Sequence, residues 1–433
     1  MENYIMERST EKIFPDNYLP KEVRNKKLKD IVVLGSQYKK EESIEIIYYL
    51  KCEGDIIEVA KKLAMDETTG KWIGDGKPTS LFKKCVADVD KVYIYDKGEG
   101  IVFIRTPIIN LSEEKDPLYQ ILMLACGGPV LEFVYYSDVA LIDINLPEKI
   151  LKKFPGPSFG IEGIRKLTET PYPEPIVGTI VKPCAGMTEK EVAEKCYLAA
   201  KGGVKFIKDD EKMLGPSYCD IKKKIKLVSN ALKKVYEEIG NKCIYAPHLV
   251  ERADRIKDTA KRYIDYGATG LMLNVVLGHN FEVLKILRED KDINVPLYAH
   301  SGGRSALSTG NRRIDDAVIV KFIRLCGGDF FQHGVFGVND THIASLDEDL
   351  LNHLIFVMRY NLKGINDTIP VAAGGLRVDN LKLNFERHYD EKFGFGVALL
   401  AGSYLLGHQK GPYFGAKEFL SSVKNLIKFI RSK

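Results

Sequence analysis

Most of the features that mark zinc-binding, secreted or membrane proteins are missing from this 433-residue sequence. It has eight cysteines, but none forms a CxxC pair and most lie in apolar segments, which argues against a zinc site and a disulfide framework. The apolar run at residues 121–125 is far shorter than the ~20 residues that span a bilayer, and no signal peptide is visible. We therefore expect a cytoplasmic protein that keeps its thiols reduced and does not enter a membrane.

A strong excess of one charge is also missing. Lysine and arginine total 64 and the acidic residues 59, which gives a net charge of +5, and the lysines are scattered along the chain. A nucleic-acid partner is therefore not expected, whereas small anionic substrates are compatible with this charge. Hydrophobic residues make up 45% of the chain, as in ordinary globular proteins, and the length allows two domains or one large barrel with an appendage.

The N-terminal third predicts an extension followed by a small α+β domain. Residues 1–38 are polar, rich in lysine and without a regular period. In residues 39–154, strand and helix patterns follow in the order βαββαβ, which predicts an antiparallel sheet backed by two helices, as in ferredoxin-like domains. The strands are expected at residues 44–50, 91–95, 100–106 and 139–144, and the helices at 55–65 and 117–125. The segment Phe154-Pro155-Gly156-Pro157 is typical of a linker.

Residues 155–433 predict a (β/α)₈ TIM barrel. Eight short apolar stretches alternate with amphipathic helical stretches such as 189–201, 221–239, 255–266 and 315–326. Eight strand–helix units over about 270 residues match the usual size of this fold. A doubly wound open sheet is the alternative, but no G-x-G-x-x-G motif follows the first strand. The strands are expected at residues 176–180, 204–207, 243–246, 271–274, 297–299, 330–332, 369–372 and 397–400.

The second of these strands ends in the charged run Lys208-Asp209-Asp210-Glu211. Because side chains alternate along a strand, Lys208 and Asp210 point to one side, and Glu211 can turn in at the strand end. Two carboxylates converging there make a hard-oxygen site suited to Mg²⁺. An ammonium group repels a metal, but a lysine carbamylated by CO₂ is an anionic oxygen donor. The alternative interpretation is a solvated charge run after a strand.

Polar residues follow the other predicted strands as well, as expected where an active site lies at the carboxyl ends of barrel strands. Glycines after the last two strands allow backbone N–H groups to approach an anion, which predicts a phosphate site. In strand order these residues are Lys182, His248, Asn274, His300, Gln332 with His333, Gly374 with Gly375, and Gly402 with Ser403.

Two motifs in this region resemble the large subunit of ribulose-bisphosphate carboxylase (RuBisCO). They are Gly178-Thr-Ile-Val-Lys-Pro183 and Gly202-Gly-Val-Lys-Phe-Ile-Lys-Asp-Asp-Glu211. Supporting pieces are Thr69-Gly70-Lys71-Trp72, Gly156-Pro157-Ser158-Phe159-Gly160-Ile161, residues 371–375 and Gly407-His408. The resemblance implies an N-terminal α+β domain, a C-terminal barrel, and head-to-tail dimers in which each active site borrows N-terminal residues from the partner subunit.

The resemblance also implies a role for each barrel residue of the site. Lys208 resembles the carbamylated lysine of the family, with Asp210 and Glu211 as the other ligands of Mg²⁺. Lys182 resembles the lysine that moves protons during enolisation of the substrate. His300 resembles the active-site histidine after the fifth strand.

The N-terminal domain is expected to contribute three residues to a neighbour's site. Asp66 falls where the family has a glutamate, and Trp72 matches a tryptophan beside a phosphate. Lys71 lies between them in the Thr-Gly-Lys-Trp loop and adds one positive charge. A homodimer, or a multiple of dimers, is therefore the expected working form.

The sequence departs from the carboxylase pattern at several positions. Cys184 replaces the second lysine of Lys-Pro-Lys, and Ser301 replaces a phosphate-binding arginine, with Arg304 three places on as the nearest substitute. The loop of residues 334–340, after the sixth strand, has no lysine, whereas the family uses one there to stabilise the carboxylation product. Further departures are His248 in place of an asparagine, Gln332 in place of a histidine, and Gly402-Ser403-Tyr404 in place of three glycines.

The retained enolisation residues and the lost carboxylation residues are typical of a RuBisCO-like protein. The expected activity is Mg²⁺-dependent enolase, isomerase or decarboxylase chemistry on a phosphorylated ketose or sugar acid, without CO₂ fixation. Because charged phosphate partners are missing, we expect a substrate with one phosphate rather than two. A divergent carboxylase and a catalytically inactive binding protein are the alternatives, and the sequence does not choose among the fates of the enediolate.

Overall fold

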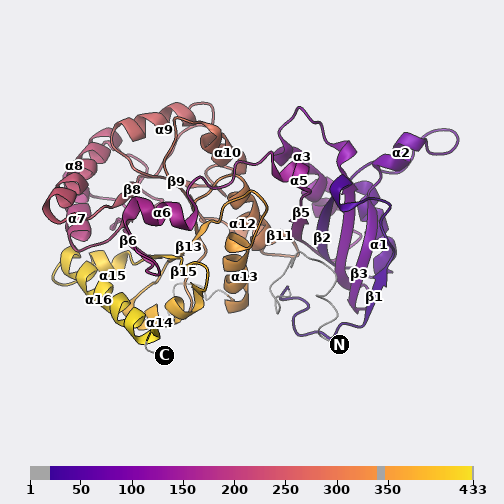
Figure 1. Ribbon diagram of the computed structural model, residues 1–433. Coiled ribbons are helices and arrows are strands. Elements are labelled where there is room, and N and C mark those ends of the chain that lie inside the picture. The colour runs from indigo at the N-terminus through magenta and orange to yellow at the C-terminus, as the bar shows by residue number, and fades with distance from the viewer. Residues whose placement is uncertain (1–19, 339–346, 432–433) are drawn as a thin grey trace. The chain divides into compact units, whose positions relative to one another are not determined.

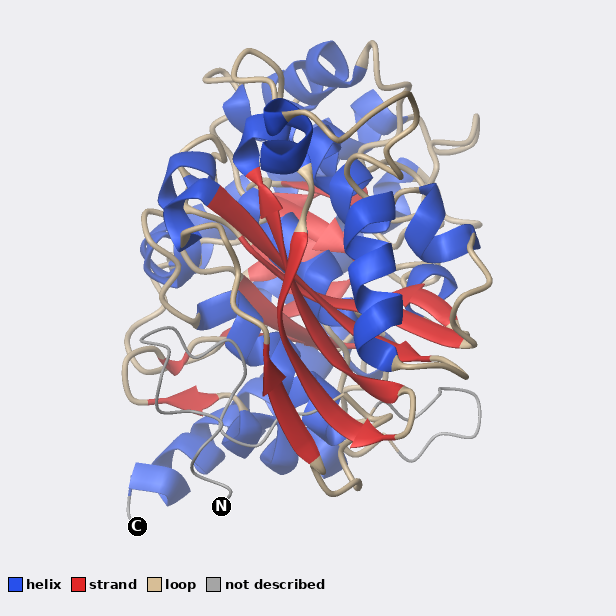
Figure 2. Ribbon diagram, turned by 90° about the vertical axis from the view of Figure 1, so that its right-hand side faces the viewer, coloured by secondary structure: helices blue, strands red, loops and turns tan. Residues whose placement is uncertain are grey.

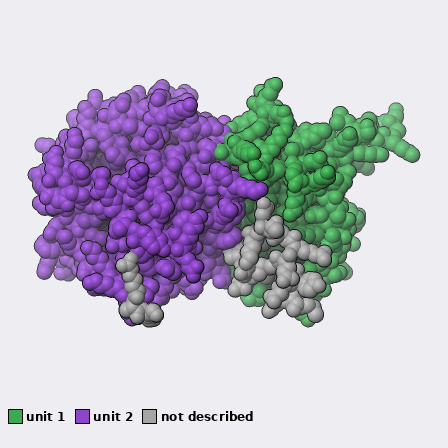
Figure 3. Space-filling view, viewed as in Figure 1, with its two compact units in different colours: residues 1–154, 303–321 green, residues 155–302, 322–433 purple. Residues whose placement is uncertain are grey.

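The computed structural model describes residues 20–338 and 347–431. Residues 1–19 of the expected extension, residues 339–340 of the loop after the sixth barrel strand, and residues 432–433 lie outside the described part. The chain forms two compact units, shown in different colours in Figure 3. Unit 1 contains Met1–Phe154 and Gly303–Lys321, and unit 2 contains Pro155–Gly302 and Phe322–Lys433.

Unit 1 is built on a six-stranded sheet in the order β1-β3-β4-β2-β5-β11, whose long twisted strands are visible in Figure 2. All neighbouring strands are antiparallel except β11, which runs parallel to β5. The strands are β1 Asp30–Val33, β2 Ser43–Lys51, β3 Asp88–Asp96, β4 Glu99–Pro107, β5 Asp138–Asn145 and β11 Arg312–Ile314. The helical elements are η2 Lys40–Glu42, α1 Ile56–Asp66, α2 Ser80–Cys85, η3 Ile108–Asn110, α3 Pro117–Cys126, α4 Gly128–Glu132 and α5 Glu148–Leu151.

Two strands of this sheet lie in segments where no strand is predicted. The strand β1 falls in the expected extension and is an exposed edge strand, so it lacks the apolar run that marks a buried strand. The strand β11 has the sequence Arg-Arg-Ile and lies between two barrel elements, so only its pairing with β5 defines it as a strand. The segment Gly303–Lys321 therefore belongs to unit 1, although the sequence order places it in the barrel.

Unit 2 is a barrel of eight parallel strands in the order β8-β7-β6-β16-β13-β12-β10-β9. The ring closes between β8 and β9, where Leu249 N–H donates to Met272 O at 2.7 Å and Met272 N–H donates to Pro247 O at 3.0 Å. The fold-class prediction of an α+β domain followed by a TIM barrel is confirmed. The strands are β6 Ile176–Ile180, β7 Phe206–Lys208, β8 Ile244–Ala246, β9 Leu271–Asn274, β10 Leu297–His300, β12 Phe330–Gln332, β13 Ile369–Ala373 and β16 Ala398–Leu400.

Helices surround this barrel, as Figure 1 shows, and each long one buries one face. The helices of this unit are α6 Gly160–Thr168, α7 Glu189–Lys201, α8 Ile221–Ile239, α9 Ile256–Asp265, α10 Phe281–Glu289, α13 Glu348–Arg359, α14 Val378–Arg387, α15 Ser403–Leu406 and α16 Pro412–Arg431. The short helix α11 Ser305–Ser308 belongs to unit 1, and α12 Asp316–Leu325 begins in unit 1 and ends in unit 2. A small hairpin, β14 Tyr389–Asp390 with β15 Gly394–Phe395, precedes β16. None of the helices in the described ranges is long and apolar enough to cross a membrane.

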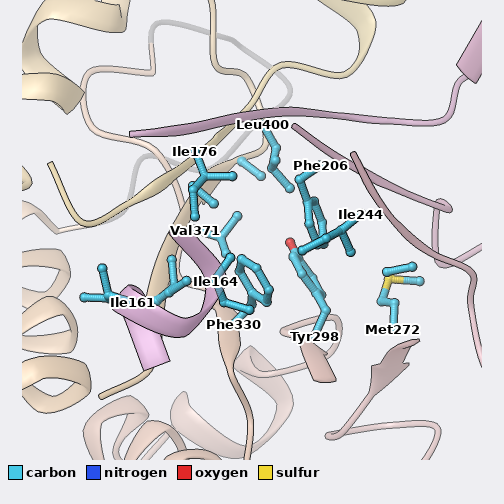
Figure 4. Packing of buried hydrophobic residues seen from close by; sticks show 14 of the residues in the cluster. Ile161, Ile164, Ile176, Phe206, Ile244, Met272, Tyr298, Phe330, Val371 and Leu400 are labelled. Carbon is cyan, nitrogen blue, oxygen red and sulfur yellow. The ribbon is translucent and has the colours of Figure 1, made fainter. Parts of the chain in front are cut away.

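The interior of the barrel is filled by apolar side chains. Phe206, Tyr298 and Phe330 stack on one another with ring centroids 4.7–5.9 Å apart, and Figure 4 shows them gathered between the strands. Ile161 and Ile164 of α6 join the same cluster from the amino end of the strands. Because the barrel is solid, substrate chemistry is confined to its ends, and the polar residues lie at the carboxyl end.

Candidate active site

Lys208 lies at the last position of β7 and is fully buried. Among the described residues, its ammonium group donates to Asp209 O at 3.1 Å and to the Met272 thioether at 3.4 Å, and it lies 5.2 Å from the Tyr298 ring centroid. Burial lowers the pKa of Lys208 to about 8, although the carboxylates of Glu211 and Asp210 oppose this shift. A useful fraction of this amine is therefore uncharged near neutral pH, and the uncharged amine is the form that adds CO₂.

Asp210 and Lys182 form an ion pair with an N–O distance of 2.5 Å between β7 and β6. Burial is the largest single influence and opposes charge on both groups, but their mutual hydrogen bond and opposite charges, with further hydrogen bonds to Lys212 N–H and Cys184, together outweigh it. The pKa of Asp210 therefore falls to about 2, and that of Lys182 rises. Lys182 also donates to the Cys184 thiol at 3.1 Å, at the position where the carboxylase pattern has a second lysine. In this arrangement Lys182 is a cation, and it gains basicity only when Asp210 turns to another partner.

Glu211 and His300 face each other, with His300 Nε2 3.4 Å from Glu211 Oε2. His300 Nδ1 accepts the Gly302 N–H at 3.1 Å, so the proton of the neutral ring is on Nε2 and is directed towards Glu211. Burial, assisted by the charge of Lys208, lowers the pKa of His300 to about 3. His300 is therefore neutral at physiological pH and acts as a hydrogen-bond donor.

These residues fit a magnesium ion only if Lys208 is carbamylated. Among residues 20–338 and 347–431, no group of three or more His, Cys, Asp or Glu side chains could hold a metal. Asp210 and Glu211 supply two carboxylates, and the buried, partly uncharged Lys208 between them would supply the third anionic oxygen as a carbamate. The donor set then consists of hard oxygens, as Mg²⁺ requires.

Three other predicted residues lie at neighbouring strand ends, and the side chains of two of them already have hydrogen-bond partners. Asn274 donates to Gly302 O at 3.1 Å and accepts two loop N–H groups through its side-chain oxygen. Gln332 accepts the Tyr298 hydroxyl at 2.8 Å. His248 is buried, its pKa is lowered by burial to about 4, and its Nδ1 has no hydrogen-bond partner among the described residues. His248 is therefore available to bind a polar group of a substrate.

His333 follows β12 but its ring is directed away from the other site residues. It is 1% exposed, and its Nε2 lies 2.9 Å from Nε2 of His388. His388 Nδ1 donates to Asn384 O, so His388 accepts at Nε2 and His333 donates. The structure thus places His333 in a buried histidine pair beside α14.

Arg304 belongs to unit 1, not to the barrel. It is 7% exposed, and its guanidinium pairs with Asp316 at an N–O distance of 3.0 Å. The neighbouring Ser301 and Gly302 are the last residues of the preceding barrel segment. The arginine that the sequence offered as a phosphate partner is therefore already neutralised by a carboxylate.

The predicted phosphate-binding turns differ in their backbone. Gly374 and Gly375 follow β13 with φ of +94° and +90°, a conformation that favours glycine. Open space surrounds Gly374, which leaves its backbone accessible to an anion. A Cβ at Gly402 would lie 3.3 Å from the Ile180 Cβ and 3.8 Å from the Lys182 Cγ. Ser403 next to it is exposed and begins the short helix α15.

The three predicted residues of the N-terminal domain lie in unit 1 at and after the end of α1. Trp72 packs edge-on against Phe82 with ring centroids 5.1 Å apart. Asp66 Oδ2 and Trp72 Nε1 are buried polar atoms without a hydrogen-bond partner in the described part of the chain. Lys71 between them is exposed. Buried polar atoms normally find partners, so Asp66 and Trp72 each retain an unused hydrogen-bonding atom within the described part of the chain.

The sequence does not predict one cluster next to the site, the buried ion pair of Asp209 and Lys224. Asp209 belongs to the charged run 208–211 but has no predicted role, and Lys224 lies in α8. A sequence signal did exist, because Lys224 occurs at helical spacing with Ile225, Val228 and Leu232 on the buried face of that helix. A lysine on an apolar face predicts an acidic partner, but it does not reveal which one.

Comparisons with known proteins agree with this geometry. The profile of the family described as ribulose bisphosphate carboxylase large chain, catalytic domain, matches residues 160–427. A 2,3-diketo-5-methylthiopentyl-1-phosphate enolase from Bacillus pumilus is 30% identical over 293 residues, 67% of this chain and 69% of that protein. The enolase of the same name from Geobacillus thermodenitrificans is 27% identical over 391 residues, 87% of this chain and 90% of that protein.

Solved structures show the same fold at low sequence identity. A rubisco-like protein from Alicyclobacillus acidocaldarius has a TM-score of 0.78 and 23% identity, covering 90% of this chain and 94% of that one. The octameric RuBisCO from Pyrococcus horikoshii has a TM-score of 0.82 and 21% identity, covering 93% of both chains. The family profile spans most of the chain and all of the strand ends described above, so the chain belongs to the RuBisCO large-chain family.

Proposed function

We propose that this protein is an enolase of the RuBisCO-like branch that acts on a monophosphorylated diketone or ketose. The relatives named above are enolases of 2,3-diketo-5-methylthiopentyl 1-phosphate, and this compound is the first substrate to test. The observation that carries the proposal is the convergence of Lys182, Asp210, Glu211 and His300 around the buried Lys208.

The barrel residues divide the chemistry among them. Mg²⁺, held by Asp210, Glu211 and carbamylated Lys208, would act as a Lewis acid on the substrate carbonyl. Lys182 would be the base for the proton on the neighbouring carbon. It must first lose its ion pair with Asp210 and release its own proton to solvent, and its partial burial favours the uncharged amine once the pair is broken. The neutral His300 donates from Nε2 and orients an oxygen of the substrate.

CO₂ fixation is not expected of this set of residues. The loop of residues 334–340 contains no lysine, and Ser301 stands where the carboxylases have an arginine. Losing a preorganised charged group of this kind typically costs ~10²–10³ in rate. Proton transfer beside a carbonyl needs neither residue, which favours enolisation as the reaction.

The same departures favour a single phosphate on the substrate. The accessible glycine turn at Gly374 and Gly375 can bind one phosphate, whereas the neutral Ser301 and the Asp316-bound Arg304 provide no free charge for a second. Losing two charge-assisted hydrogen bonds of ~1.5–3 kcal/mol each weakens binding at least ~100-fold. Calorimetric titration with a bisphosphate inhibitor of carboxylases tests this point, and micromolar or tighter binding would revive the carboxylase alternative.

A homodimer is part of the proposal. Asp66 and Trp72 carry buried polar atoms without partners, and exposed apolar side chains occur on the loops after β7, β8 and β9. These exposed side chains are Leu214, Tyr218, Val250 and Leu277. Mixing the inactive variants Lys182→Ala and Trp72→Ala should restore activity in heterodimers, because one hybrid site escapes both substitutions. Verified heterodimers without activity would contradict a shared site.

Exchange of the substrate's α-proton with D₂O tests the enolisation itself. The wild type should exchange this proton of 2,3-diketo-5-methylthiopentyl 1-phosphate only when Mg²⁺ and bicarbonate are both present. Lys208→Met should abolish the dependence on bicarbonate together with the exchange. Exchange that proceeds in the presence of a chelator, or incorporation of labelled CO₂ into the product, would refute the proposal.

A further inference from the structure

Asp209 and Lys224 form a buried ion pair directly behind the candidate metal ligands. Their side chains are 0% and 1% exposed. Asp209 separates Lys208 from Asp210 in the sequence, and alternation directs its side chain away from the site, towards the helices outside the barrel. The pair therefore cannot bind substrate, and its effect on the site must act through the backbone.

The Asp209 carboxylate connects three separate elements. Its Oδ1 accepts the Tyr245 hydroxyl of β8 at 2.9 Å. Its Oδ2 accepts the Lys224 ammonium of α8 and the backbone N–H of His248 at 3.1 Å. One side chain thus fixes the end of β7 to the neighbouring strand and to the helix that covers both.

The backbone of Asp209 is fixed in the same way. Its N–H donates to Ala246 O at 3.1 Å, which continues the β7–β8 ladder one residue beyond the strand. Its carbonyl oxygen accepts the Lys208 ammonium at 3.1 Å. A rotation of this residue would therefore move the oxygen that holds Lys208 and, through the chain, the carboxylate of Asp210.

We propose that Asp209, Lys224 and Tyr245 are positioning residues that set the geometry of the metal ligands Lys208 and Asp210. The inference rests on the proposed magnesium site and goes beyond it, because it assigns the alignment of the ligands to a network outside the site. Groups behind metal ligands commonly change metal affinity 10- to 100-fold when they are removed.

Electrostatic attraction alone and the loss of ligand positioning predict opposite changes in Mg²⁺ affinity for the same substitution. Lys224→Met removes a positive charge close to a cation site, so Coulomb's law alone predicts tighter Mg²⁺ binding. Loss of alignment predicts weaker binding. A fall in affinity is therefore diagnostic of positioning.

The test measures Mg²⁺ affinity by calorimetry in bicarbonate, and carbamate formation by ¹³C NMR with ¹³CO₂, so that turnover is not needed. We expect Lys224→Met to weaken Mg²⁺ binding at least about tenfold and to reduce the carbamate signal. Lys224→Arg, which keeps the charge, should stay within about threefold of the wild type. Tyr245→Phe removes a single hydroxyl, and it should weaken binding about three- to tenfold even if Lys224→Met does not fold.

Two matched variants separate positioning from general effects. Lys223→Met makes the same charge change at the exposed neighbouring position of α8, and it should leave affinity unchanged. Arg288→Met breaks the comparable buried pair with Asp329 at the other end of the barrel, and it should also leave affinity unchanged. If both Lys224→Met and Tyr245→Phe bind Mg²⁺ with wild-type affinity, or if Arg288→Met loses as much affinity as they do, the positioning role is refuted. Neither result would affect the proposed function. A wild-type chain that takes up neither Mg²⁺ nor ¹³CO₂ would refute the proposed function as well.

Discussion

At the amino ends of the barrel strands, the buried Arg288 and Arg324 each donate to several acceptors, whereas at the carboxyl ends the buried Lys208 has only weak partners in the described part of the chain. Arg288 pairs with Asp329, and Asp329 also accepts the backbone N–H groups of Leu297 at 2.8 Å and Phe159 at 2.9 Å. Arg324 donates to three backbone carbonyl oxygens at 2.9–3.2 Å. At the other end, Lys208 has a carbonyl oxygen and a thioether as its partners among the described residues.

This difference suggests a physical division in the barrel: the amino ends of the strands stabilise the fold, and the carboxyl ends carry the reactive groups. A buried charge with several good hydrogen bonds restrains the backbone groups that it binds. A buried amine with poor partners is destabilised in its charged form, as the lowered pKa of Lys208 shows. The weakly partnered Lys208 at the carboxyl end is therefore the group expected to react in the proposed mechanism.

The largest expected effect comes from Lys182→Met at the carboxyl end. Removing the proposed base should lower the rate of α-proton exchange ~10²–10⁴-fold. The side chain is about one third exposed, so the fold should persist, and Mg²⁺ binding should survive because Asp210 loses a competitor. Proton exchange followed by NMR, together with calorimetry, measures both quantities. Unchanged exchange would assign the base to another group.

Arg288→Met at the amino end should have the opposite profile. Removing one partner of a buried pair leaves Asp329 uncompensated, which typically costs about 3–5 kcal/mol of the free energy of unfolding. Exchange activity of the protein that remains folded should stay within about threefold of the wild type. Urea unfolding and the exchange assay measure the two effects. A stable but inactive variant would show that the two ends are not separate in function.

The contrast between the ends also explains what could be predicted from the sequence. Strands such as β9 and β10 carry short apolar runs, and each ends in a polar residue, so both the barrel and the residues at its carboxyl end follow from local patterns. The acceptors of Arg324 are backbone oxygens of residues 357, 365 and 366, which leave no trace in side-chain chemistry. The strand β11 likewise forms because it pairs with β5, which lies more than 160 residues earlier, and its own three residues carry no strand pattern.

The smallest expected effect is a pH dependence that arises from His388, which follows α14 and pairs with His333 just beyond the end of β12. Burial, with help from the charge of Arg359, lowers the pKa of His388 to about 3, whereas an unfolded histidine titrates near 6.5. Between these values the unfolded chain takes up a proton that the folded chain does not, so stability falls as the pH falls below about 6.5.

The substitution His388→Gln removes the titrating imidazole and keeps polar atoms near Asn384 O and His333 Nε2. Between pH 7.5 and 5.5 the wild type should therefore lose about 1.4 kcal/mol more of its unfolding free energy than the variant. Urea unfolding of both proteins at these two pH values measures the difference, and titration of carboxylates common to both cancels. Parallel losses in the two proteins would mean that the histidine pair accepts a proton inside the fold.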